Sequence, residues 1–161
     1  MSTTTSEPGI EQTVGVEHLF DMSIELEDPQ LIATPLGQRV TYIIRSGTVA
    51  GPRLSGTLVP GGGDWLMLGA DGVLRVDVRC TIRTDDEQLI FVTAGGVVQI
   101  PPDAMERYGA GERLSWEDLY ARTTLLFETG AEAYSWLNGT ATIAINEVAP
   151  NRVDYRVYGL R

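Results

Sequence analysis

Apolar and polar residues alternate along most of the chain, the pattern of β-strands buried on one face. The alternation predicts nine strands, over residues 17–26, 38–51, 53–60, 64–69, 73–84, 88–100, 121–129, 139–148 and 152–160. Short polar segments such as Ala-Asp-Gly, Thr-Asp-Asp-Glu and Ala-Pro-Asn separate several of them and are typical of tight turns. We therefore expect antiparallel pairing between successive strands.

Few segments interrupt this pattern. Pro101-Pro102 opens the segment DAMERYG, and Ser115 opens SWEDLYARTT with a Ser-x-x-Asp capping pattern, so both are predicted short helices. The Gly95-Gly96 pair indicates a β-bulge. The fold class expected is all-β: a closed antiparallel β-barrel of about eight or nine strands, lipocalin-like in general shape, with one or two short helices. A β-sandwich is the alternative, but closure removes exposed strand edges and favours the barrel.

The N-terminal composition and the two faces of the strands predict the domain organisation and the oligomeric state. Residues 1–14 are rich in Ser, Thr and Glu and predict a disordered tail, and residues 15–161 predict a single β-barrel domain. The runs LIFV, LLF and WLML are apolar on both strand faces. One face can fill the barrel, and the other needs cover from the short helices or from a second subunit. A homodimer is therefore expected.

Composition narrows the partners. The chain has 161 residues, 43% of them hydrophobic, and 22 acidic against 12 basic residues give a net charge of −10. This charge argues against binding to nucleic acid or to an anionic membrane surface. The N-terminal segment lacks the features of a signal peptide, and no run approaches the length of a membrane helix, so a cytoplasmic location is expected.

Metal and nucleophile chemistry receive little support. Cys80 is the one cysteine, which excludes an intrachain disulfide, and its place in an alternating run favours packing over a nucleophilic role. His18 is the one histidine and is interpreted as an ordinary strand residue rather than a base. No metal-ligand motif is visible, so no metal and no cofactor is predicted. The run PGGGDW lacks the lysine of a phosphate loop and is better explained as a turn or a close backbone approach.

A charged face is the most informative chemical feature. Arg75, Asp77, Arg79, Thr81 and Arg83 alternate with apolar residues in one strand. They could be solvated cross-strand ion pairs, or Asp77 and Arg79 could line the barrel mouth near Asp64. An Arg fork can hold a carboxylate or polarise a substrate oxygen, whereas an acid against an apolar ring is pushed towards its neutral form.

Further candidates follow the same logic. Glu128 is a second acid, close in sequence to aromatic residues. Tyr42, Trp65, Tyr134 and Trp136 could wall an apolar ligand site, although core packing explains each one individually. Asp85 and Asp86 more plausibly serve a turn than catalysis.

Several of these motifs together resemble a known family. They are Gly51-Pro52, Gly62-Gly63-Asp64-Trp65, Asp77-x-Arg79, Thr84-Asp85-Asp86, and Phe127-Glu128-Thr129 with Tyr134, Trp136 and Leu137. From about residue 16 to the end, the chain resembles domain-of-unknown-function family 3237, also called uncharacterised protein family 0311. The resemblance implies a small antiparallel β-barrel but no reaction. One departure is Glu87, which stands where the family pattern has glycine after Asp-Asp.

Three hypotheses for function follow. The first is a cofactor-independent acid/base enzyme (an isomerase, lyase, cyclase or epoxide-opening hydrolase) acting on a small apolar substrate that contains oxygen. In it Asp64 is the proton acceptor or water activator, Arg79 the oxygen polariser, Asp77 the orienting partner of Arg79 and Glu128 a second acid. The second is a carrier or sensor of a small hydrophobic ligand. The third is a structural or partner-binding protein, which a solidly filled barrel would favour.

Overall fold

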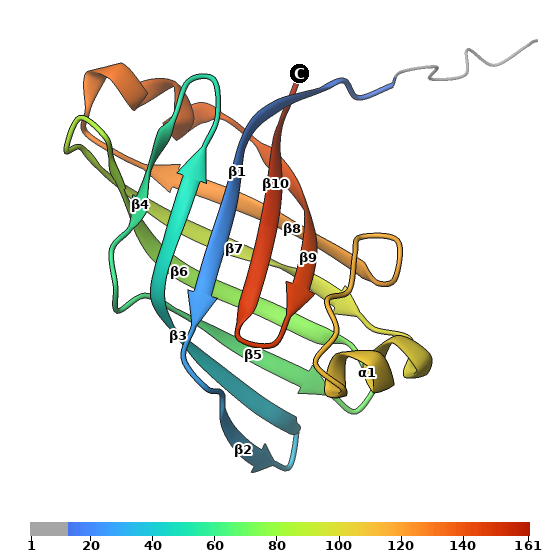
Figure 1. The fold of residues 1–161 in the computed structure, drawn as a ribbon. Helices are drawn as coiled ribbons and strands as arrows, with labels where there is room; N and C mark the ends of the chain where they lie inside the picture. The colour runs from blue at the N-terminus through green and yellow to red at the C-terminus, as the bar shows by residue number, and fades with distance from the viewer. Residues whose placement is uncertain (1–12) are drawn as a thin grey trace, which may run out of the picture.

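Ten antiparallel strands form one sheet that closes on itself (Figure 1). The computed structural model describes residues 13–161, so most of the predicted tail, residues 1–12, lies outside the described residues. The strands are β1 (Val16–Leu26), β2 (Gln30–Thr34), β3 (Gly37–Ala50), β4 (Ser55–Leu58), β5 (Gly63–Gly69), β6 (Leu74–Thr84), β7 (Leu89–Gln99), β8 (Tyr120–Glu128), β9 (Thr142–Ala149) and β10 (Arg152–Leu160). One α-helix, α1 (Pro102–Gly109), and one 3₁₀-helix, η1 (Glu132–Gly139), complete the described fold. Among these residues, neither helix is long and apolar enough to cross a membrane.

Pairing of the first and last strands closes the barrel. β1 pairs with β10 on one side and with β3 on the other, so the sheet has no free edge at this point. β4 and β5 share one position between β3 and β6, because β4 pairs with residues 48–50 of β3 and β5 with residues 37–43. The result is a closed eight-stranded barrel with two further strands, which confirms the predicted all-β barrel.

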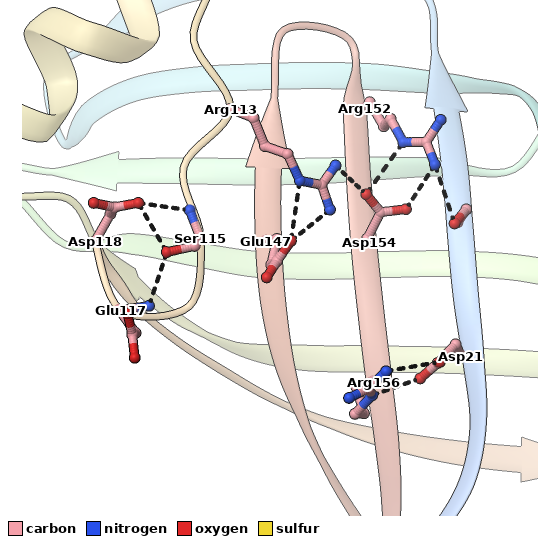
Figure 2. Close-up of polar contacts among 10 residues, drawn as sticks. Asp21, Arg113, Ser115, Glu117, Asp118, Glu147, Arg152, Asp154 and Arg156 are labelled. Carbon is pink, nitrogen blue, oxygen red and sulfur yellow. Dashed lines mark hydrogen bonds and ion pairs between the residues drawn. The ribbon is translucent and has the colours of Figure 1, made fainter.

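Three local predictions need correction. β2 was not predicted, because its side chains are mostly exposed and show no alternation. The segment that begins at Ser115 is a turn followed by β8, not a helix: the Ser115 amide and hydroxyl both donate to Asp118, at 2.8 and 2.9 Å (Figure 2). The register of β7 with β6 and β8 runs through Gly95 and Gly96 without a bulge. Glycine is needed at position 96 because a Cβ there would lie 2.2 Å from the Arg122 carbonyl oxygen.

The β6–β7 turn shows how the chain accommodates Glu87, which stands where the family pattern has glycine. Glu87 adopts a left-handed conformation with φ of 65°, and its amide donates to the Thr84 carbonyl at 2.9 Å. A three-residue hairpin loop places its last residue in this region, which glycine enters without steric cost. This chain therefore tolerates at Glu87 a strain that glycine would avoid.

The two halves of the barrel interior differ. The half nearer η1 is solidly packed by large side chains that are at most 1% exposed, among them Phe20, Ile82, Ile90, Leu125 and Leu137. Phe20 and Phe127 meet edge to face with centroids 5.9 Å apart. The half nearer α1 is not filled in this way, and α1 and η1 lie at opposite ends of the barrel (Figure 1).

An ion-pair network holds the loop between α1 and β8 against the barrel wall (Figure 2). Arg113 contacts Asp154 at 2.6 Å and donates to Glu147 at 3.0 Å, and Arg152 joins Asp154 at 3.1 Å and Glu25 at 2.9 Å. A backbone bridge between Leu114 and Val148 lies beside it. Each exposed pair is worth little on its own, but Arg113 and the Leu114–Val148 bridge together tie the loop that follows α1 to β9 and β10.

Candidate active site

The unfilled half of the barrel holds a cavity of about 340 Å³. Its wall is mainly apolar and includes Val40, Leu66, Leu68, Leu74, Val76, Val98 and Val148. Leu31 and Met105 also line it and are 61% and 43% exposed, so the cavity reaches solvent between β2 and α1. The volume is within the range of small-molecule sites, and its lining suits a largely apolar ligand.

A glycine run places Asp64 in this cavity. Gly61 turns the chain with φ of 101°. A Cβ on Gly62 would lie 2.6 Å from the Arg79 carbonyl oxygen, and one on Gly63 would lie 2.8 Å from that of Tyr42. These glycines let the start of β5 enter tightly between β3 and β6. The PGGGDW run is thus both a turn and a close approach, and it sets the acid on the inner face.

Burial controls the protonation of Asp64. Desolvation raises the pKa of its carboxyl from an ordinary 3.8 to about 7. The Asp77 amide donates to Oδ1 of Asp64 at 3.2 Å and acts in the opposite direction, while the negative charge of Asp77 adds a smaller increase. Both protonation states are therefore populated near neutral pH, which a carboxyl needs if it is to act as acid and base in turn.

Tyrosines surround this carboxyl. Tyr42 lies opposite Asp64 in the β3–β5 register, and both line the cavity. Burial, then the neighbouring Tyr108 hydroxyl and the Asp64 charge, raise the pKa of Tyr42. Tyr155, which is 4% exposed, has its pKa raised well above the ordinary value by burial, with a contribution from Asp64. The raised pKa keeps the hydroxyls of Tyr42 and Tyr155 in the neutral form, which can donate a hydrogen bond.

The other predicted charged residues lie elsewhere. Asp77 and Arg79 form an ion pair of 3.2 Å, with side chains 45% and 53% exposed on the outer face of β6. The inner face of this strand carries Val76, Val78 and Cys80, so the alternation that points those residues inward points Asp77 and Arg79 outward. Glu128 is exposed at the end of β8, away from the cavity wall. The structure therefore does not bring Asp64, Arg79 and Glu128 together.

The predicted aromatic wall is also divided. Trp65 pairs with Thr41 and faces away from the side shared by Asp64 and Leu66. Tyr134 and Trp136 pack against the filled half of the core from η1. Tyr134 donates to Asp86 at 2.7 Å, and the Arg53 guanidinium lies 3.8 Å from the centroid of Trp136. Of the four predicted aromatic residues, the structure places Tyr42 in the cavity wall with Asp64.

The residues interpreted from the sequence as turn, packing or ordinary strand residues lie in such places in the structure. Asp86 accepts hydrogen bonds from Thr84 and Tyr134, and the Asp85 amide donates to the Ser55 carbonyl at 3.0 Å. Cys80 is 3% exposed, and burial raises the pKa of its thiol to about 12. His18 lies on the exterior, 3.0 Å from Asp21.

Seven polar residues of the cavity were not predicted: Gln38, Tyr108, Thr123, Asn146, Asn151, Arg152 and Tyr155. The alternation places Thr123, Asn146 and Tyr155 on inner strand faces, so a polar residue at an inward position was the available signal. Their distance from Asp64 along the sequence hid their relation to it.

Comparison with known proteins agrees with this architecture. The family model described as a protein of unknown function, DUF3237, matches residues 14–160. The chain belongs to this family. The resemblance inferred from the motifs is therefore confirmed. A family relative, a UPF0311 protein of Clostridium acetobutylicum, is 29% identical over 144 residues, covering 88% of this chain and 91% of the relative.

Solved structures and one named enzyme extend the comparison. A crystal structure of a conserved protein of unknown function from Rhodopseudomonas palustris matches with a TM-score of 0.88 at 23% identity, covering 93% of this chain and 99% of the other. An enzyme from Penicillium herquei matches with a TM-score of 0.71 at 22% identity, covering 98% and 100%. These two show a shared fold. A hydroalkoxylation enzyme of Penicillium herquei is 27% identical over 126 residues, which cover 78% of this chain and 62% of that enzyme.

Proposed function

We propose that this protein is a cofactor-independent enzyme in which Asp64 transfers protons to and from a small, largely apolar substrate that contains oxygen. The observation that carries the proposal is a single carboxyl with a pKa of about 7 in the wall of an otherwise mainly apolar cavity. Such a carboxyl is costly to bury and is of use where acid/base chemistry is needed.

The related hydroalkoxylation enzyme suggests the reaction class. Hydroalkoxylation adds a hydroxyl O–H across a carbon–carbon double bond: a C–O bond and a C–H bond form, while the O–H bond and the π bond break. No oxidant or reductant is required. Asp64 would deliver a proton to carbon as the acid and accept the hydroxyl proton as the carboxylate, and whichever transfer comes first, the second restores its starting state. A cyclase of this kind is within the reaction types predicted from the sequence.

The neighbouring groups fit this role. Tyr42 lies opposite Asp64 across the β3–β5 pair, and its hydroxyl, kept neutral by burial, can donate a hydrogen bond to a substrate oxygen. The Asp77 amide holds Oδ1 of Asp64 in place. Tyr108 on α1 would close the cavity over a bound substrate. Asp77 and Arg79 thus have no proposed contact with the substrate through their side chains.

The test uses phenols that carry an ortho alkenyl chain, incubated with the protein in D₂O. Wild-type protein should form the cyclic ether with one deuterium on carbon, detected by mass spectrometry. Asp64→Asn should reduce the rate by about 10²-fold or more, the usual scale of general acid/base catalysis. The matched control Glu106→Gln changes an exposed carboxylate on α1 and should retain the wild-type rate. Full activity in Asp64→Asn would refute the proposal.

A carrier or sensor is the second candidate, favoured by the apolar lining and the opening between β2 and α1. It predicts tight retention of an apolar ligand by both wild type and Asp64→Asn, with no product from either. The cavity counts against the third hypothesis, which called for a filled barrel.

We also propose that the protein forms a homodimer and lies in the cytoplasm. The exposed apolar side chains of Phe91, Leu126 and Ile143 on the outer sheet face support the homodimer.

A further inference from the structure

Two buried polar side chains stand in the cavity wall apart from the acid and the tyrosines. Thr123 and Asn146 are 2% and 3% exposed and come from the inner faces of β8 and β9. The Thr123 hydroxyl donates to Oδ1 of Asn146 at 3.2 Å. With its oxygen turned towards Thr123, the Asn146 amide has its nitrogen directed away from that hydroxyl.

The amide nitrogen of Asn146 is the available group. It carries two N–H donors, and among the hydrogen bonds of residues 13–161 none is donated by it. No fully buried side-chain nitrogen or oxygen in this part of the chain lacks a partner, so this nitrogen is not sealed in the wall but borders open space. The space that Asn146 lines is the cavity. A donor held there is suited to an oxygen acceptor on a ligand.

Asn146 is linked to the acid through Tyr155. The two residues are register partners between β9 and β10, and Tyr155 is close enough to Asp64 for that charge to affect its pKa. Asp64, Tyr155 and Asn146 therefore all line the same, mainly apolar cavity.

We propose that Asn146, oriented by Thr123, binds a carbonyl oxygen, and that the substrate is a hydroxyl-bearing compound whose double bond is conjugated to that carbonyl. This inference rests on the proposed function of Asp64. The substrate hydroxyl adds to the β carbon as its proton passes to the Asp64 carboxylate, and the π electrons move onto the carbonyl oxygen. The Asn146 N–H groups stabilise that charge. Asp64 then returns a proton to the α carbon and the carbonyl re-forms.

The test follows a carbonyl probe that cannot cyclise. We would use 4-phenylbut-3-en-2-one labelled with ¹³C at the carbonyl and record its stretching band by infrared difference spectroscopy. Bound to wild type and to Asp64→Asn, the band should lie at lower frequency than in hexane. In Asn146→Leu it should return to the hexane position, with affinity about tenfold weaker, the scale of one hydrogen bond lost in a buried site.

A second pair of variants guards against loss of the fold in Asn146→Leu. Thr123→Val leaves the amide but removes the group that orients it, and should broaden the band and reduce its shift. Thr123→Ser keeps the hydroxyl and should restore the wild-type band. An unshifted band in wild type, or a wild-type band in Asn146→Leu and Thr123→Val, would overturn the carbonyl assignment.

Turnover separates this inference from the proposed function. If Asp64→Asn loses turnover while Asn146→Leu keeps the shifted band, the carbonyl assignment alone is wrong. If Asn146→Leu loses the shift while Asp64→Asn keeps full turnover, the carbonyl site stands and the role of Asp64 fails.

Discussion

Replacing Asp64 with asparagine should make the protein more stable at alkaline pH. The pKa of this carboxyl rises from 3.8 to about 7 on folding because the site is desolvated. Below pH 3.8 the group is protonated in both states and has no effect. As pH rises from there to about 7, the unfolded chain releases the proton and the folded protein retains it, so the free energy of unfolding falls. Above pH 7 the cost is constant.

The magnitude follows from the shift. One pKa unit corresponds to 1.36 kcal/mol, so a shift of about 3 units costs the folded protein about 4 kcal/mol at high pH. Roughly half of this, about 2 kcal/mol, develops between about pH 5.5 and pH 8.5, a range in which an acidic protein stays well charged. Asparagine has no proton to lose and keeps an oxygen that can accept from the Asp77 amide.

Urea unfolding at about pH 5.5 and about pH 8.5, followed by tryptophan fluorescence, measures how the free energy of unfolding changes with pH. The stability advantage of Asp64→Asn over wild type should be greater by about 2 kcal/mol at the higher pH. Glu106→Gln, on the exposed face of α1, should follow wild type at both. A difference between Asp64→Asn and wild type that does not change with pH would show that Asp64 has an ordinary pKa despite its burial.

Three further changes test other parts of the structure. Glu87→Gly should raise the free energy of unfolding by up to about 1 kcal/mol, because glycine removes left-handed strain; a lower melting temperature would contradict this. Leu68→Trp should fill the cavity and abolish binding of an apolar fluorescent probe, whereas Trp65→Phe, on the other face of β5, should leave it intact; equal losses would argue against the placement of the cavity. Phe20→Ala should cost about 3–5 kcal/mol in urea unfolding, against about 0.5 kcal/mol or less for exposed Leu126→Ala; similar costs would disprove the solid half of the core.

The strands were largely predictable because burial on one face imposes a period of two. β6 shows this clearly, since its inner residues are buried from Val78 to Thr84 while Arg79 and Arg83 face out. β2 was not predicted because Leu31 and Ile32 are both exposed, so the strand shows no contrast between an apolar buried face and a polar exposed face. The helix predicted to begin at Ser115 was wrong because a Ser-x-x-Asp pattern also closes a turn.

The candidate site was predictable only in part. The glycine run correctly drew attention to Asp64, whose position depends on local backbone approach. Trp65 was predicted to line the site beside Asp64, but adjacent residues of a strand face opposite sides, so Leu66 lines the cavity instead. Asn146 and Tyr155 join the site through barrel closure, a long-range consequence of the β1–β3 and β1–β10 pairing that local patterns do not specify.

Titration of the Asp64 carboxyl carbon by ¹³C NMR tests the central claim most directly. In protein labelled at aspartate Cγ, the Asp64 resonance is assigned by its loss in Asp64→Asn and followed from acid to alkaline pH. We expect a transition at about pH 7, displaced when an apolar ligand occupies the cavity. A transition near the ordinary value of 3.8 would show that the carboxyl is well solvated, and a proton-transfer role for Asp64 at neutral pH would lose its physical basis.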